Sequence, residues 1–236
     1  MQQFRAGRSG RVRVGGTPFF MDGVIAAILG EFQSEQPNIR IDQSYAYSTD
    51  LIESVASKRL DLAICPLRVE AVPDGLTFEE ILPGLNVIAC RVAHPLSRRG
   101  AIKPADIMEY PWIAPPVESP LYEDLRQAVA HVGATALRIS FSGGSLASVV
   151  NVLTGSDALT VLPYSVVHAM RRQRTITALS LKIGDPDRHL GLLFSSSADP
   201  SPAARRLRSF LTSRFDALAQ RIALDRRQAF LHSDTS

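Results

Sequence analysis

The stretch from Gly84 to Ser97, GLNVIACRVAHPLS, is the feature that most restricts how this chain can fold. Residues 87–92 are nearly all small or branched apolar residues, a pattern typical of a strand buried on both faces of a parallel sheet. Pro95 cannot continue a central strand, because it has no amide hydrogen to donate. Similar α/β patterns precede and follow this stretch, so we expect it to cross between two halves of the chain. Such a crossover predicts a cleft in which a ligand binds.

The first half alternates between the strand period of two and the helix period of 3.6. Val12 and Val14 predict a short strand that breaks at Gly15-Gly16, and a helix then runs to a point before Pro37. Further predicted elements are a half-buried strand around Ile39–Asp42, a helix beginning at Ser48-Thr49-Asp50, and a strand over Leu60–Cys65 that stops at Pro66. This β-α-β-α-β order predicts a mostly parallel, doubly wound sheet.

The second half repeats this alternation and then returns to the first. Its predicted elements are a strand at 112–115, a helix from Pro120 to about Val132, a strand at 137–141, a helix opened by Gly143-Gly144-Ser145, and a strand at 158–162. Residues 189–196 are apolar enough to serve as a return crossover. A last helix from Pro202 to about Gln228 keeps a helical apolar period, and we expect it to pack on the first half.

Composition and charge exclude several classes of protein. Of 236 residues, 45% are hydrophobic and 21% are charged, as in ordinary globular domains. No apolar run approaches the ~18 residues that a membrane span needs, and no secretory signal precedes the first strand, so we expect a cytoplasmic protein. The net charge of +3 comes with scattered arginines and no helix-turn-helix pattern, which argues against DNA binding by this chain.

Four loops at predicted strand ends carry hydroxyl groups or amide donors. In open α/β sheets ligands lie beyond the carboxyl ends of the strands, where helix amino ends present unpaired N–H groups. Two loops come from each half, so their convergence suits a carboxylate or another small anion, and no arginine or lysine is expected in them. The alternative is that Ser48, Thr49, Ser119 and Ser145 only cap helices. The four loops are Gly15–Phe19, Tyr47–Thr49, Glu118–Leu121 and Ser142–Ser145.

Four motifs in order resemble the effector-binding domain of LysR-type transcriptional regulators, over about residues 10–216. They are GRVRVGGTPFF, STDLIESVASKRLDLAI, the apolar strand ending in His94-Pro95-Leu96, and SLASVVNVLTGSDALTVLP. The resemblance implies an α/β fold of two Rossmann-like subdomains joined by two crossover strands, with a ligand cleft between them, as in type II periplasmic binding proteins. The implied divisions are 1–10 for a linker remnant, 11–87 with 193–228 for subdomain I, 88–192 for subdomain II, and 229–236 for a flexible tail.

The resemblance also implies an effector pocket. Its residues would hold the ligand by amide and hydroxyl donors, with Phe19, Phe20 and Tyr122 as apolar walls, although Phe19 and Phe20 could instead be plain core. Effector binding would favour one subdomain arrangement and so change dimer contacts and transcription. The implied pocket residues are Gly16, Thr17, Pro18, Ser48, Thr49, Pro66, Leu67, Ser119, Pro120 and Leu121, with Gly144 and Ser145 as weaker candidates.

Regulators of this family begin with a winged helix-turn-helix and a linker helix, and neither pattern occurs here. We therefore expect a sensor domain that has been separated from its DNA-binding segment, or a natural stand-alone sensor. The resemblance implies a homodimer, and a tetramer at full length, with DNA bound only through the missing segment. The first helix could supply a dimer contact, while solvent exposure of Met21, Ala27 and Gly30 is the alternative.

Enzymatic and metal-binding alternatives gain no support from the sequence. No GxSxG elbow occurs, the histidines lack metal-ligand spacing, and we expect no metal and no cofactor. His94 is expected to be structural, and Cys65 and Cys90 are expected to be buried thiols, with a redox-sensing Cys65 as a weaker alternative. A solute-binding protein of the same fold, or an enzyme built on it, remains the alternative function.

Overall fold

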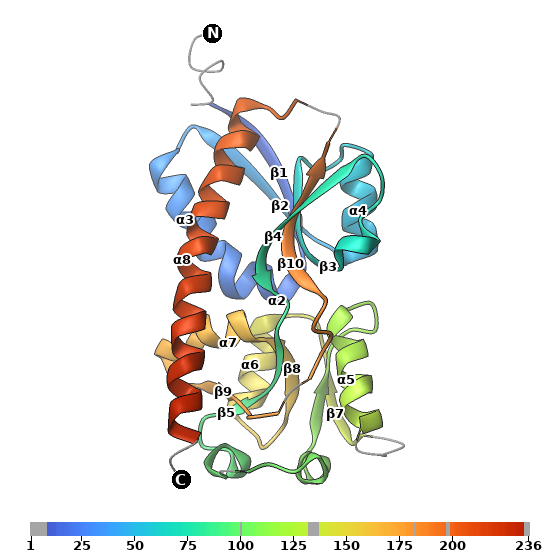
Figure 1. Ribbon diagram of the computed structural model, residues 1–236, viewed down its shortest axis with the longest axis vertical. Helices are drawn as coiled ribbons and strands as arrows, with labels where there is room; N and C mark the ends of the chain where they lie inside the picture. Colours follow the sequence, from blue (N-terminus) through green and yellow to red (C-terminus); the bar gives the residue numbers. More distant parts are fainter. Residues whose placement is uncertain (1–8, 100, 132–136, 182, 197–198, 234–236) are drawn as a thin grey trace. The chain divides into compact units, whose positions relative to one another are not determined.

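The computed structural model describes residues 9–99, 101–131, 137–181, 183–196 and 199–233 (Figure 1). The chain forms two compact units. Unit 1 draws on residues 1–17, 24–84 and 187–236, and unit 2 on residues 18–23 and 85–186. The chain thus passes between the units four times, at Thr17–Pro18, Gly23–Val24, Gly84–Leu85 and Pro186–Asp187. Residues 18–23, which the sequence placed in subdomain I, pack in unit 2. Most of the linker remnant proposed for residues 1–10 lies outside the described residues.

Unit 1 is built on a five-stranded sheet (Figure 1). Its strands are β1 (Gly10–Gly16), β2 (Ile39–Tyr45), β3 (Leu62–Leu67), β4 (Leu76–Pro83) and β10 (His189–Ser195). They lie in the order β2-β1-β3-β10-β4. β1 pairs in parallel with β2 and β3, which confirms the parallel sheet predicted for the first half. β10 lies antiparallel to both β3 and β4, so the predicted return strand completes this sheet.

Helices cover the sheet of unit 1 because each has one apolar face. They are α3 (Ala26–Glu35), α4 (Ser48–Ala56) and α8 (Pro202–Ser233), whereas the short turn η2 (Val69–Ala71) after β3 buries none of its residues. Leu51 and Val55 of α4 pack with Ala63, Cys65 and Leu193 in one buried cluster. α8 lies against β1, β4 and α3, as the sequence predicted, and its Phe210 ring meets Phe32 of α3 edge-on with centroids 5.3 Å apart.

Unit 2 has its own strands (Figure 1). They are β5 (Asn86–Arg91), β6 (Trp112–Ala114), β7 (Ile139–Ser142), β8 (Thr160–Pro163) and β9 (Ile176–Ala178). β5 lies between β8 and β9 and is antiparallel to both, so the parallel neighbours predicted for residues 87–92 are wrong. The apolar run correctly predicted a buried strand, since Ile88, Ala89 and Cys90 are fully buried. Burial does not depend on strand direction, so the run could not predict whether the neighbouring strands are parallel or antiparallel. β6 and β7 pair in parallel, and a bridge between Trp112 and Leu159 links them to the chain just before β8.

The helices of unit 2 begin close to where the sequence placed them, except for the one that starts at Tyr164, which the sequence did not predict. They are α2 (Pro18–Phe20), α5 (Pro120–His131), α6 (Leu146–Thr154) and α7 (Tyr164–Met170), with shorter turns η3 (Pro95–Arg98), η4 (Pro104–Glu109) and η5 (Arg171–Gln173). A π-helical turn, η1 (Met21–Ile25), continues α2 into α3 of unit 1. Met21, which we considered a candidate for the outer face, is fully buried, whereas Ala27 and Gly30 are exposed.

Two predicted boundaries are wrong. β3 continues through Pro66 to Leu67, because β1 pairs with β3 only as far as Ile64 and no strand on that side needs an amide hydrogen from Pro66. α8 continues through residues 229–233, which the sequence assigned to a flexible tail, and residues 234–236 lie outside the described part. Among the described residues, no helix has the length and apolar character to cross a membrane.

Candidate functional site

One edge of the unit 1 sheet collects six of the twelve predicted site residues. β1, β2 and β3 are parallel, so their carboxyl ends meet at the same edge, with Gly16 paired to Tyr45 on one side and to Ile64 on the other. The amide of Ala46 donates to the carbonyl oxygen of Gly16 over 3.2 Å, which holds the two loops together. The residues at this edge are Gly16, Thr17, Ser48, Thr49, Pro66 and Leu67.

The amino end of α4 is open at this edge. α4 starts at Ser48 after an extended Tyr47, whose side chain forms no capping hydrogen bond, and the first helical bond runs from the Leu51 amide to the Tyr47 carbonyl. The amides of the first three helical residues therefore lie outside the helical hydrogen-bond ladder. Such an end favours an anion, because the N–H groups and the helix dipole both point positive charge outward.

Neither hydroxyl at the start of α4 is used as a cap. The Ser48 hydroxyl donates to the carbonyl oxygen of Pro66 over 3.2 Å and so joins α4 to the end of β3. The Thr49 side chain is exposed, and within the described part of the chain its hydroxyl forms no hydrogen bond. The capping alternative is therefore wrong for both residues.

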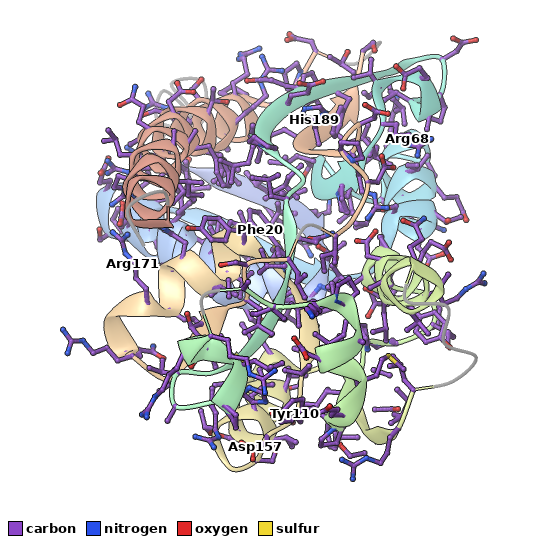
Figure 2. All side chains as sticks on the ribbon, turned by 60° about the horizontal axis from the view of Figure 1, so that its bottom comes forward. Phe20, Arg68, Tyr110, Asp157, Arg171 and His189 are labelled. Atoms are coloured by element: carbon purple, nitrogen blue, oxygen red, sulfur yellow. The ribbon has the colours of Figure 1, made fainter. Side chains whose placement is uncertain are left out.

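A guanidinium and an imidazole that the sequence analysis missed flank this edge. Arg68 follows Leu67 directly and is exposed, and His189 is the register partner of Leu67 at the start of β10 (both labelled in Figure 2). The His189 Nδ1 lies 3.8 Å from a carboxylate oxygen of Glu80. The four loops themselves contain no arginine or lysine, so the positive charge at this edge comes from Arg68, which lies outside them. Arg68 could have been found as the residue after Pro66-Leu67, whereas His189 required knowledge of the pairing between β3 and β10.

Unit 2 brings the remaining polar candidates to an edge of its own. β6 and β7 are parallel and end together at Ala114 and Ser142, and a Cβ on Gly144 would lie 3.2 Å from the Pro116 side chain. The loop before α5 and the loop before α6 are therefore neighbours. The predicted residues at this edge are Ser119, Pro120, Leu121, Gly144 and Ser145.

Here the serines do cap helices. The Ser119 hydroxyl accepts from the Leu121 amide over 3.3 Å and is buried. The Ser145 hydroxyl accepts from the Ser148 amide, also over 3.3 Å, at the start of α6. The capping role, which was the alternative to ligand contact, is therefore confirmed for these two serines. A ligand could still donate a hydrogen bond to a remaining lone pair of either hydroxyl oxygen.

The three aromatic residues proposed as walls of the pocket differ in burial. Phe19 and Phe20 are buried in unit 2, so the plain-core alternative is confirmed for them. Phe20 is labelled in Figure 2. Pro18, which begins α2, and Tyr122, on α5, are half-buried. A ligand could reach Tyr122 with less rearrangement than it could reach either phenylalanine.

Comparison with known proteins identifies the family. Residues 5–216 match the LysR substrate binding domain. The chain belongs to this family. Its curated relatives are transcriptional regulators, so the family-level evidence agrees with a protein that is not an enzyme.

Two curated relatives show how much of a full-length regulator this LysR domain represents. The SDS degradation transcriptional activation protein of Pseudomonas sp. (strain ATCC 19151) is 23% identical over 207 residues, covering 86% of this chain and 66% of that protein. The HTH-type transcriptional regulator PcaQ of Agrobacterium fabrum is 25% identical over 190 residues, covering 80% and 61%. The LysR domain thus spans less than two thirds of these relatives.

Solved structures of LysR regulatory domains share its fold. The effector binding domain of QuiR in complex with shikimate has a TM-score of 0.63 at 16% identity, covering 89% of this chain and 98% of that one. The regulatory domain of CcmR from Synechocystis PCC6803 in complex with 2-PG has a TM-score of 0.69 at 17% identity, covering 88% and 98%. The predicted fold class is therefore confirmed.

The cysteines of this LysR domain are poorly suited to redox sensing. Both are fully buried, Cys65 in β3 and Cys90 in β5. Burial raises the pKa of each thiol to about 12, so the reactive thiolate is scarce at neutral pH. The expectation of buried thiols is confirmed, and the redox-sensing alternative for Cys65 loses its physical basis.

His94 has the structural role that the sequence favoured. Its buried ring accepts a hydrogen bond at Nδ1 from the Leu96 amide over 3.0 Å, and its Nε2 lies 3.2 Å from the Asp157 carbonyl oxygen. The Tyr110 ring covers it with centroids 4.5 Å apart. Desolvation lowers the pKa of His94, which favours the neutral ring that this arrangement requires. Among the described residues, no cluster of histidine, cysteine or carboxylate side chains could hold a metal ion.

Proposed function

We propose that this chain is the sensor of a LysR-type transcriptional regulator and that its effector is a small organic anion. The observation that carries the proposal is the open amino end of α4, where three amides outside the helical ladder lie beside the exposed Thr49 hydroxyl. Arg68 adds positive charge to the same edge of unit 1. Amides, a hydroxyl and a guanidinium are the donors that bind carboxylates and phosphates.

The predicted site residues take different parts in this proposal. Thr49 and the α4 amides bind the anionic group, and Ser48 holds them in place through its bond to Pro66. The loops of unit 2 that contain Ser119–Leu121 and Gly144–Ser145, with Tyr122 of α5, are further candidates for polar and apolar contact with the effector.

The regulatory consequence follows from differential binding. An effector shifts an equilibrium between two arrangements only by the difference in its affinity for them. The sensor passes that difference to a homodimer, or a tetramer at full length, and from there to DNA held by a separate winged helix-turn-helix segment. This activity belongs in the cytoplasm, where DNA and metabolic effectors meet.

The test is a thermal-shift screen of the purified chain against organic acids, phosphorylated acids, sugars and amino acids, with shikimate and 2-PG, the ligands of the two structural neighbours, among the first compounds. A ligand at ~100 times its dissociation constant adds about 2.7 kcal/mol to the free energy of unfolding, which is a shift of several degrees for a chain of this size. We expect stabilisation by acids and none by neutral sugars. Recovery of the ligand unchanged separates a sensor from an enzyme.

A pair of variants in α4 locates the site. Thr49→Val should weaken binding of any stabilising acid, whereas Ser57→Ala, at the far end of the same helix, should leave the affinity unchanged. The Ser57 hydroxyl donates to the Glu53 and Ser54 carbonyl oxygens within its own helix, so it offers a matched loss of one hydroxyl. Stabilisation only by neutral sugars, or equal affinities for both variants, would overturn the proposed anion site.

A further inference from the structure

A buried carboxylate lies at the point where the chain enters unit 2. Asp124 of α5 is fully buried, and its Oδ2 accepts a hydrogen bond from the side-chain amide of Asn86. Asn86 is the first residue of β5, directly after the passage at Gly84–Leu85. Burying a carboxylate costs free energy unless hydrogen bonds satisfy it. The pair therefore fixes α5 firmly against the start of β5.

The second passage reaches the same pair of side chains. Ile183 forms an antiparallel bridge with Asn86. Gly184 follows with φ +86, and a Cβ built on it would lie 3.4 Å from the Asn86 Cβ and 3.7 Å from the Asp124 Cγ. The chain leaves unit 2 only two residues later, after Pro186. Asn86, Asp124 and Gly184, here called the clasp, thus join two of the four connecting segments, those at Gly84–Leu85 and Pro186–Asp187, to one helix.

The helix that carries the clasp also carries part of the proposed effector site. α5 begins at Pro120, directly after Ser119, and Asp124 lies about one helical turn further along. A turn of helix is stiff because consecutive backbone hydrogen bonds fix it. Any displacement of the first turn of α5 therefore reaches Asp124 and, through its hydrogen bond, Asn86.

We propose that Asp124 is a positioning residue that couples the amino end of α5 to two of the connecting segments, those at Gly84–Leu85 and Pro186–Asp187. The part of this inference that concerns an effector rests on the proposed function. The mechanical part, that the clasp sets how tightly the connections are held, does not require any ligand. The experiment below uses the ligand-free chain, so its failure is distinct from a failed effector screen.

The first measurement is amide hydrogen exchange on the full chain, compared with Asn86→Ala. This variant lies on the connection and does not touch residues 119–121. We expect exchange to accelerate by about tenfold or more both at residues 85–88 and in the first turn of α5, as for the loss of a hydrogen bond to a charged group. The single variant Asp124→Asn, in an otherwise unmodified chain, should keep most of the protection, because its amide oxygen can still accept from Asn86.

A matched control lies elsewhere in unit 2. Asp157 pairs with Arg91 over 2.5 Å, and it sits in the turn before β8, away from both connections. Asp157→Asn should accelerate exchange near Arg91 and leave residues 85–88 and the first turn of α5 as in the unmodified chain. A merely destabilising substitution in unit 2 would instead raise exchange throughout the unit in both variants.

The second measurement follows the distance between the units by energy transfer. Cysteines at the exposed positions Ala56, in α4, and Asn151, in α6, take the dyes, while the buried Cys65 and Cys90 are spared. We expect the distance distribution to broaden when the clasp is replaced by leucine at both Asp124 and Asn86. Replacing both partners by apolar groups of similar shape can be nearly neutral for stability, which keeps this variant folded.

Three results would overturn the proposal. One is a folded double-leucine variant whose distance distribution matches that of the unmodified chain. Another is Asn86→Ala with faster exchange at residues 85–88 but unchanged protection in the first turn of α5. The third is broadening of equal size in Asp157→Asn. If the double-leucine variant does not fold, Asn86→Ala tests the proposal instead, by amide hydrogen exchange and by energy transfer between the two dyes.

Discussion

The hydroxyl of Ser48 donates a hydrogen bond to the carbonyl oxygen of Pro66 over 3.2 Å, and this bond joins the first residue of α4 to the end of β3. Two parallel strand ends and a helix start are thereby held at one place. Because the Ser48 proton is committed to the protein, the neighbouring Thr49 hydroxyl is the one at this turn that a ligand can engage. The two hydroxyls, adjacent in sequence, have separable roles.

Substitutions at these two positions should separate stability from affinity. Ser48→Ala should lower the free energy of unfolding by about 1 kcal/mol, the usual net contribution of one hydrogen bond. Thr49→Val should change it by less than about 0.5 kcal/mol, because the side chain is exposed. Urea unfolding measures the first quantity, and calorimetric titration with a stabilising acid measures affinity. An unstable Thr49→Val with normal affinity would assign Thr49 to the fold instead of the site.

Two glycine substitutions should have opposite effects on stability. A Cβ on Gly84 would lie 2.1 Å from the carbonyl oxygen of Arg188, and backbone there cannot move without disturbing the Gly84 amide bond to the same oxygen. Gly84→Ala should therefore cost about 2 kcal/mol or more. Gly30→Ala, in α3 with open space around the new methyl, should stabilise by about 0.5–1 kcal/mol. Equal unfolding midpoints for the two variants would contradict both estimates.

Acid should destabilise unit 2 through His94. Its pKa is lowered by desolvation in the folded chain, so the unfolded chain binds the proton more readily below about pH 6.5. Stability from the neutral ring is fully present above that pH and is lost as the pH falls toward the lowered folded value, with a slope of at most about 1.4 kcal/mol per pH unit.

His94→Asn should flatten that dependence. The asparagine oxygen can replace Nδ1 as acceptor for the Leu96 amide but carries no titrating proton. Denaturant unfolding from pH 7.5 down to pH 5 compares the slopes, which are independent of the packing that the smaller side chain loses. A variant as steep as the unmodified chain would mean that other groups carry the acid sensitivity.

Thiol chemistry should be absent from the native chain. Because burial raises the pKa of Cys65 and Cys90 to about 12, we expect a maleimide at pH 7.5 to label neither residue until denaturant is added. Mass spectrometry after mild peroxide should likewise find both thiols intact. Rapid native labelling of Cys65 would show that β3 opens, and it would restore the redox alternative.

Local sequence patterns were sufficient for most elements of the fold. The apolar faces of α3, α4, α6 and α8 are buried where the helical period put them, because burial of one face is what creates that period. β4 was not predicted at all. Its alternation is interrupted by the adjacent Glu79 and Glu80, and the register with β10 shifts between Leu190 and Gly191, so no period of two survives along it.

Pairing between distant segments limited the prediction of the site. The sequence placed Gly16, Ser48 and Pro66 at strand ends correctly, since β-α-β units put those ends on one edge. It could not place His189 beside Leu67, because an antiparallel strand inserted from far along the chain leaves no local trace. Nor could it distinguish the capping serines of unit 2 from the uncapped start of α4, which depends on backbone angles.

The insertion of β10 between β3 and β4 also has a consequence for synthesis of the protein. β4 has β10 as its neighbour in the sheet, and about a hundred residues separate the two strands along the chain. A ribosome therefore releases β4 long before its partner exists, and unit 2 is translated in full in the meantime. Non-local pairing of this kind is slow to form. The newly made chain must carry an unfinished sheet edge until its last strand arrives, which makes this interval the one in which chaperones matter most.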